Sequence, residues 1–227
     1  MRRAAVFALV LAVGVSLLMF RGDLGRDVPL YEFQRPPQPS DPKLIERPKT
    51  AADKIVNGAK LEVIRRVLYN PSYVSISYPN GDVPSGQGAC TDVLVRALRN
   101  AGYDLQKLIH EDMTRHFGLY PKKWGLTRPD PNIDHRRAPN HLVFMRRFAK
   151  DLPTDTAGDA AETWKPGDLV YWDLNGRGRT HCGVISNDRN DEGLPLVVHN
   201  IGPTARQDDC LCSWKIIGHF RYPHTQS

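Results

Sequence analysis

The sequence has few cysteines, and their placement argues against a disulfide framework. Four cysteines occur in 227 residues. Cys90 stands alone, Cys182 directly follows a histidine, and Cys210 and Cys212 are too close in the chain to join distant segments. This last pair could be either oxidised or reduced. No C-x2-C pair is present, and the pair His219 and His224 lies at the end of the chain without one upstream, so we expect no metal site. We expect no cofactor either.

The chain also lacks a basic stripe with interleaved aromatic residues, and it lacks any internal repeat. The first absence argues against a nucleic-acid partner, and the second argues against a repeat array. The net charge is nonetheless +6, of which Arg2 and Arg3 contribute two units. The remaining charge of about +4 suits an anionic cell-wall or membrane surface.

Long apolar runs are absent except at the N-terminus. Residues 4–20 form a charge-free, largely apolar run of 17 residues that follows Arg2 and Arg3. This pattern predicts an export segment at residues 1–22, as a signal peptide or a membrane anchor. The run is short for a membrane span, but it offers no good A-x-A cleavage site near its end, which favours the anchor. We therefore expect an exported, periplasmic protein, held at the inner membrane if this segment is not cleaved.

A proline-rich stretch separates this segment from the rest of the chain. Residues 23–49 contain RPPQPSDPKLIERPK, which can sustain neither helix nor sheet, and we interpret them as a linker. Thr50 then has the position of an N-cap, and apolar residues repeat at helical spacing until Asn70 and Pro71. Residues 50–227 are therefore predicted to form one domain, which we expect to be monomeric.

Within this domain, helices are predicted before strands. Apolar spacing indicates helices near residues 90–100 and 104–117, and another over HLVFMRRFAKDL with Asn140 as its N-cap. After residue 160 the chain changes to short segments separated by turns, namely DLVYWDL, HCGVISN, PLVVHNI and SWKIIGHFRY. This segregation predicts the α+β class with an antiparallel sheet and argues against a parallel one.

Cys90 stands where a glycine-rich loop meets a predicted helix, in the stretch GQGACTDVLVRAL. A thiol at the first turn of a helix lies near unpaired N–H groups and the positive end of the helix dipole, which stabilise the thiolate. The Cys90 amide could also stabilise an oxyanion. This position alone is compatible with three roles: a small buried hydrophobic residue, half of a disulfide, or a nucleophile.

Two histidines later in the chain have positions suited to a catalytic base and its partner. His181 opens the predicted strand HCGVIS and His199 ends the next strand, so a hairpin through NDRNDEG makes them cross-strand neighbours. One could act as base while the other holds its tautomer. Alternation places Asn200 on the opposite face, but a register shift of one residue would make Asn200 the third residue instead of His199. A purely structural role for each histidine is the alternative.

Four segments resemble the NlpC-like cell-wall cysteine peptidases of the papain-like superfamily: GQGACTDVLVRAL, WKPGDLVYWDL, THCGVIS and PLVVHNIG. The resemblance covers roughly residues 55–222 and is closest to an uncharacterised branch of exported bacterial proteins. It implies a papain-like fold, with N-terminal helices packed on a C-terminal antiparallel sheet. It also implies Cys90 as nucleophile, His181 as base and His199 as the orienting third residue.

Two departures from that family concern substrate binding. The family's Asp-Cys-Ser-Gly motif is replaced by Ala-Cys-Thr-Asp, which makes Asp92 a candidate for substrate contacts. About 60 additional residues lie between the nucleophile helix and the P-G-D strand and must reshape the groove. By analogy with the family's tyrosine, either Tyr73 or Tyr78 would add a hydroxyl to the oxyanion site.

The insertion contains the polar segment DPNIDHRRAPNH. Its central residues are too polar for a core, and two adjacent arginines could bind a substrate carboxylate in bidentate fashion. The candidate substrate-binding residues here are Asp134, His135, Arg136 and Arg137. A solvated loop with a local Asp–Arg pair is the alternative.

Together these features predict an exported cysteine hydrolase that cleaves amide bonds in peptidoglycan stem peptides. A non-catalytic wall-binding or scaffold module would keep the groove without turnover. A third interpretation keeps the chemistry but changes the substrate to an amide or acyl bond outside the wall.

Overall fold

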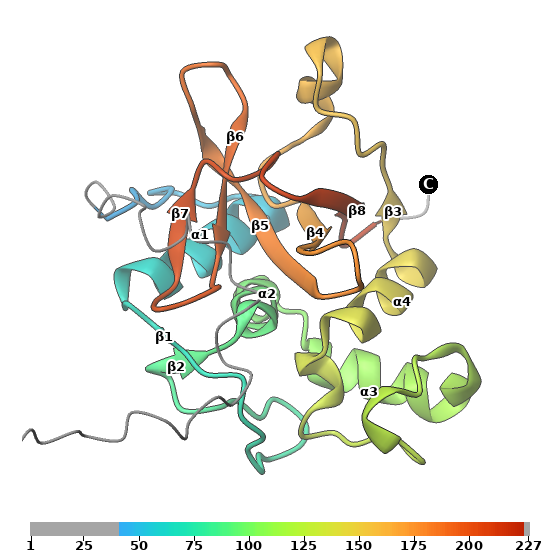
Figure 1. Ribbon diagram of the computed structural model, residues 1–227. Coiled ribbons are helices and arrows are strands. Elements are labelled where there is room, and N and C mark those ends of the chain that lie inside the picture. The colour runs from blue at the N-terminus through green and yellow to red at the C-terminus, as the bar shows by residue number, and fades with distance from the viewer. Residues whose placement is uncertain (1–40, 225–227) are drawn as a thin grey trace, which may run out of the picture. The chain divides into compact units, whose positions relative to one another are not determined.

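The computed structural model describes residues 41–224, in which most helices come first and most strands second (Figure 1). Its α-helices are α1 (Ala51–Ile64), α2 (Cys90–Asn100), α3 (Leu105–His116) and α4 (Ala138–Phe148). All of them overlap segments predicted from apolar spacing, and the predicted α+β class is confirmed. The first helix ends before the apolar residues 67 and 68, and α4 begins two residues before Asn140, so the N-cap predicted there is wrong. The predicted export segment and most of the predicted linker lie outside the described residues.

The larger of the two sheets in this part of the chain has six antiparallel strands in the order β3-β8-β4-β5-β6-β7. Their bounds are β3 (Lys150–Asp151), β4 (Leu169–Asp173), β5 (Thr180–Arg189), β6 (Pro195–His199), β7 (Arg206–Asp208) and β8 (Lys215–Arg221). Four of these strands, β4, β5, β6 and β8, are those predicted from the sequence. Two short strands, β1 (Leu68–Tyr69) and β2 (Gln87–Gly88), pair in parallel just before α2.

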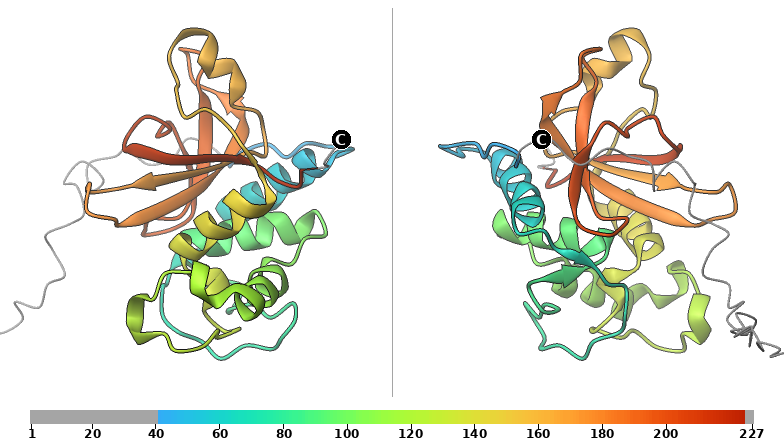
Figure 2. Two further views of the ribbon diagram at one scale, coloured as in Figure 1. Left: turned by 90° about the vertical axis from the view of Figure 1, so that its right-hand side faces the viewer. Right: turned by 60° about the vertical axis from the view of Figure 1, so that its left-hand side comes forward.

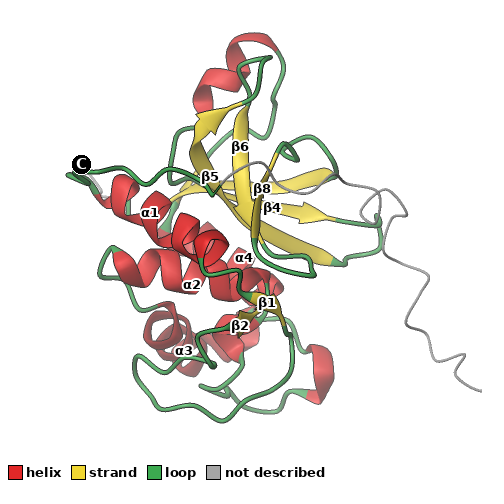
Figure 3. Cartoon of the chain, turned by 90° about the vertical axis from the view of Figure 1, so that its left-hand side faces the viewer, coloured by secondary structure: helices red, strands yellow, loops and turns green. Residues whose placement is uncertain are grey.

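The helices gather on one side of the sheet (Figure 2; Figure 3), where α2 contacts both α1 and β5. Val93, Leu94 and Leu98 of α2 are at most 1% exposed, and each such side chain stabilises the fold by about 1.5–3 kcal/mol. Gly58 lets α1 approach closely, since a Cβ there would lie 2.8 Å from the Cα of Ala97. This packing holds the first turn of α2 against the sheet.

A second core lies on the other face of the sheet. It is rich in tryptophan and consists of Trp164, Val170, Trp172, Ile185, Val197, Cys210, Leu211 and Trp214. Successive side chains of a strand point to opposite faces, so β5 serves both cores. Cys182 and Val184 belong to the core on the helix side, and Ile185 belongs to the tryptophan-rich core.

The segment just before α1 belongs to the folded part. The backbone N–H and C=O of Ile45 both bond to the Asn57 side chain at 2.8 Å, and Nζ of Lys60 donates to the Lys43 carbonyl at 2.8 Å. The buried Lys60 ammonium also pairs with Asp188 of β5 at 2.7 Å. The last residues of the predicted linker are therefore packed on α1. Among residues 41–224, no helix combines the length and apolar character that crossing a membrane requires.

Candidate active site

Cys90 is the first residue of α2 and lines a surface cleft of about 500 Å³. It is 9% exposed. Ala89 precedes it in an extended conformation, and the Ala89 N–H donates to Oδ2 of Asp92 at 2.6 Å, which fixes the first turn of the helix. The thiol is therefore held at the positive end of the helix dipole, as the sequence predicts.

His181 and His199 are hydrogen-bonded neighbours on β5 and β6. Nε2 of His181 lies 2.9 Å from Nδ1 of His199, and Nε2 of His199 lies 2.9 Å from Oδ2 of Asp208 on β7. The pairing of Gly183 with His199 puts both histidines on one face of the sheet, as the predicted hairpin requires. A relay of three side chains thus runs across three adjacent strands.

Asn200 lies outside this relay. Its side-chain amide donates to the carbonyls of Val67 and Gly88 at 3.2 and 3.1 Å. Asn200 therefore ties the end of β6 to the backbone around β1 and β2. The register makes His199, and not Asn200, the neighbour of His181.

The Asp208 carboxylate at the end of the relay determines which nitrogens of the two imidazole rings carry protons. An ionised carboxylate only accepts, and Arg206, whose Nε lies 2.8 Å from Oδ2 of Asp208, favours that form. Nε2 of His199 therefore carries a proton, and its Nδ1 accepts from Nε2 of His181. Burial lowers the pKa of His199 to about 4 although Asp208 acts in the opposite sense, so this ring is neutral near pH 7. His181 keeps Nδ1 for proton exchange with another group.

Tryptophan rings enclose the two histidines. Trp172 stacks on His181, with ring centroids 5.5 Å apart and planes at 18°, and Trp214 meets both imidazoles edge-on. Gly183 makes this packing possible, since a Cβ there would lie 3.2 Å from the Trp172 ring and 2.5 Å from Val197. Both imidazoles are buried, which shields their hydrogen bond from water.

The thiol of Cys182, on the helix side of β5, hydrogen-bonds to Cys90. This hydrogen bond and the His181 imidazole lower the pKa of the Cys90 thiol well below its ordinary value, although burial acts in the opposite sense. Burial also raises the pKa of Cys182, which therefore stays a neutral donor beside the thiolate. Two consecutive residues of one strand thus stabilise negative charge on Cys90.

Replacing Cys182 with alanine should raise the pKa of Cys90, because the thiolate loses a hydrogen-bond donor. The pH profile of Cys90 alkylation by iodoacetamide should then shift upward by about one pH unit, which slows alkylation by about tenfold on the acidic limb and leaves the rate at high pH unchanged. Cys182→Ser keeps a donor and should retain most of the wild-type profile. Mass spectrometry can follow alkylation, with the exposed Cys212 as internal reference. An identical pH profile for Cys182→Ala and wild type would contradict this role.

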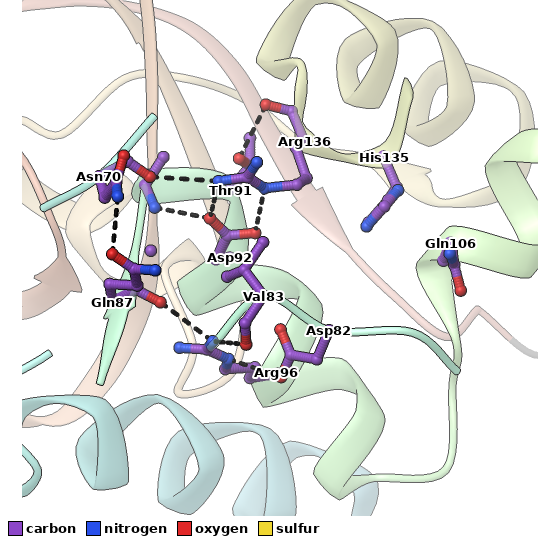
Figure 4. A network of polar contacts seen from close by, with 12 residues as sticks. Asn70, Asp82, Val83, Gln87, Thr91, Asp92, Arg96, Gln106, His135 and Arg136 are labelled. Atoms are coloured by element: carbon purple, nitrogen blue, oxygen red, sulfur yellow. Dashed lines mark hydrogen bonds and ion pairs between the residues drawn. The ribbon is translucent and has the colours of Figure 1, made fainter. Parts of the chain in front are cut away.

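Asp92 and Arg136 form a buried ion pair at the first turn of α2 (Figure 4). Nε and Nη2 of Arg136 donate to the two carboxylate oxygens of Asp92 at 2.8 and 2.9 Å. Thr91 Oγ1 donates to the Arg136 carbonyl at 3.0 Å, which fastens the 3-10 helix η4 (Asp134–Arg136) to α2. Arg136 reaches the cleft wall, but its charge is already paired with Asp92. Asp92 does not line the cleft, so its predicted substrate contact is wrong, and of the predicted two-arginine clamp Arg137 alone stays a candidate for substrate binding.

The rest of the predicted clamp segment divides into buried and exposed parts. Asp134 and His135 are 0% and 2% exposed and do not line the cleft. Burial raises the pKa of Asp134 to about 6 and lowers that of His135 to about 3. Arg137 does line the cleft, where its guanidinium carbon lies 4.4 Å from the centroid of the Trp124 ring. Arg137 is therefore the residue of this segment whose charge is available to a ligand in the cleft.

The tyrosines that line the cleft are Tyr69 and Tyr73. Tyr78 packs edge-on against His110 of α3, with ring centroids 5.0 Å apart, so its predicted place at the site is wrong. Burial and the charge on Cys90 raise the pKa of Tyr69 to about 12. The Tyr69 hydroxyl therefore stays protonated and able to donate near Cys90.

Three residues of this site are not predicted from the sequence: Tyr69, Cys182 and Asp208. Asp208 ends a three-residue strand, which is too short to show periodicity. Alternation along β5 puts Cys182 on the opposite face from His181, but its contact with Cys90 depends on where α2 packs. The sequence around Tyr69 carries no signal that β1 leads into the cleft.

Related sequences cover most of the described chain. Residues 56–222 match the family described as Domain of unknown function (DUF1287). The chain is 46% identical over 168 residues to the Uncharacterized protein YijF of Escherichia coli (strain K12), which corresponds to 74% of this chain and 80% of that protein. No solved structure matches the chain. This protein therefore belongs to the DUF1287 family.

Proposed function

We propose that this protein is a cysteine hydrolase that cleaves amide bonds, with Cys90 as the nucleophile. The observation that carries the proposal is the chain of contacts from Cys90 through His181 and His199 to Asp208. A nucleophilic cysteine needs a base beside it, and the base needs a group that holds its orientation. In this protein the orienting histidine is itself held by a carboxylate.

In the proposed reaction, the Cys90 thiolate attacks the amide carbonyl while His181 is protonated. The Cys90 amide and the Tyr69 hydroxyl donate to the oxyanion. Nδ1 of His181 gives its proton to the leaving amine as the C–N bond breaks, and a thioester remains on Cys90. A water molecule then attacks the thioester and returns a proton to Nδ1. The acid product leaves, and the thiolate–imidazolium pair is restored.

The papain-like, NlpC-type fold and the cell-wall substrate belong to this proposal. A nucleophile at the start of a helix, packed on an antiparallel sheet that carries the base, supports the fold. The export segment predicted at residues 1–22 supports a periplasmic location. We therefore take peptidoglycan stem peptides as the substrate.

The purified full chain should release soluble fragments from isolated peptidoglycan, and mass spectrometry of the digest should identify the cleaved amide bond. Alkylation of Cys90 before the digest should stop this release. A scaffold with the same cleft would bind the wall without releasing fragments, and its Cys90 would label no faster than the exposed Cys212. Slow labelling without release would contradict the enzyme, and rapid labelling without release would contradict the wall substrate.

A further inference from the structure

The cleft beside Cys90 is lined by basic and aromatic residues and by no acidic one. It is formed by sixteen of the described residues, and the basic and aromatic ones are Lys123, Arg136, Arg137, Arg179, Tyr69, Tyr73 and Trp124. The nearby Asp130 does not line the cleft, but its Oδ2 accepts a hydrogen bond from the Tyr73 hydroxyl at 3.1 Å. A concave surface with this charge attracts anionic groups.

The positive charges of this lining differ in how far they are already paired. Arg136 is neutralised by the bidentate contact with Asp92. Arg137 has a looser ion pair, with 3.5 Å between its Nη1 and Oδ1 of Asp134. Within residues 41–224, Lys123 makes no hydrogen bond or ion pair. Lys123 and Arg137 therefore retain charge that a ligand can use.

These cations come from segments that approach one another at the cleft. Lys123 and Trp124 belong to the 3-10 helix η3 (Lys123–Gly125), whereas Gly178 and Arg179 belong to the loop before β5. Nζ of Lys123 lies 3.9 Å from the position that a Cβ on Gly178 would occupy. A small anion between these segments would meet positive charge from more than one side.

Trp124 has an unusual conformation for a bulky residue. Its φ and ψ are 63° and 27°, in the left-handed region, and the side chain is 57% exposed. Such a backbone conformation costs about 1–3 kcal/mol, and residues that adopt it cluster at active sites, ligand-binding segments and switch regions. Because Arg137 lies over this ring, an apolar surface and a cation are presented together.

We propose that this cleft selects substrates with a free carboxylate next to the scissile amide, and that Lys123 and Arg137 bind that carboxylate. The inference rests on the cysteine hydrolase proposed above and names its substrate class. The guanidinium of Arg137 can donate to both carboxylate oxygens, and the Lys123 ammonium adds a second charge. Trp124 supplies the surface against which the rest of the peptide packs, and Arg179 adds positive potential.

Two synthetic peptides test the carboxylate directly. L-Ala-γ-D-Glu-L-Lys-D-Ala and its α-carboxamide, L-Ala-γ-D-isoGln-L-Lys-D-Ala, differ only in one carboxylate beside an amide bond. The full chain should cleave the acid with a kcat/KM about tenfold above that for the amide, the order of one charge-assisted hydrogen bond. Lys123→Gln and Arg137→Gln should each bring this ratio toward one, whereas Lys107→Gln, at an exposed lysine of α3, should keep it.

Binding to the Cys90→Ala variant separates this inference from the hydrolase. By calorimetry, this variant should bind the acid peptide about tenfold more tightly than the amide, and an equal concentration of inorganic phosphate should not displace it. Equal affinity for the two peptides, no binding of either, or displacement by phosphate would overturn the carboxylate site. Selective binding without cleavage by wild type would keep the carboxylate site and reject the hydrolase acting on these peptides. Cleavage of both peptides at equal rates would keep the hydrolase and reject the carboxylate site.

Discussion

Replacing Cys90 with alanine should reduce the release of wall fragments by at least about a thousandfold, since loss of the nucleophile in comparable catalytic triads costs up to about 10⁶ in rate. Cys182 cannot take over, because burial keeps its thiol neutral. The residual rate would then reflect only substrate binding and the oxyanion donors. The measurement is the initial rate of fragment release from isolated peptidoglycan.

His181→Ala should cause a loss of similar size, and the double variant should be no slower than either single one, because base and nucleophile act as a unit. Circular dichroism should show that each variant is folded. Cys212→Ala, which removes an exposed thiol, should release fragments at the wild-type rate. Substantial release by folded Cys90→Ala protein would refute the cysteine mechanism.

Breaking the buried Asp92–Arg136 pair should lower the free energy of unfolding by about 3–5 kcal/mol. Arg136→Met leaves the Asp92 carboxylate, which is 2% exposed, without its two guanidinium donors. It also leaves the carbonyls of Asn70 and Ser72 without the donors that Arg136 supplies at 3.1 and 2.6 Å. The melting temperature, measured by circular dichroism, should fall by about 10 °C.

The double variant Asp92→Asn/Arg136→Met tests whether an uncompensated charge causes this loss. Removing both charges should restore part of the stability that Arg136→Met loses. Lys107→Gln breaks an exposed pair, 3.9 Å from Glu111, and should change the stability by less than about 0.5 kcal/mol. Equal melting temperatures for Arg136→Met and wild type would show that the pair does not stabilise the fold.

The sequence predicts the longer elements because each leaves a pattern within its own segment. The apolar stripe of α2 and the alternation in β5 are visible without knowledge of any neighbour. β3 and β7 have two and three residues, too few for such a pattern, and they exist as partners of β8 and β6. Their positions therefore follow from the assembled sheet.

The candidate site is partly predictable for the same reason. The contact between His181 and His199 follows from a hairpin, which converts sequence order into a cross-strand pair. Asp208 completes the relay from a strand beyond an irregular segment, so its position is not encoded locally. The clamp prediction fails for Arg136 because its partner, Asp92, is 44 positions away in the sequence. A polar segment is predicted to be exposed to solvent unless the buried residue of opposite charge that pairs with it is known.

His181 and Cys182 approach one thiol from opposite faces of β5. In the unfolded chain neither residue is near Cys90, whose thiol would then have an ordinary pKa of about 8.5 and be mostly protonated at neutral pH. The charge on Cys90 is therefore a property of the junction between α2 and β5, and not of the cysteine alone. In a newly made chain, Cys90 therefore gains its lowered pKa and the nucleophilic reactivity that follows from it only after α2 has packed on β5.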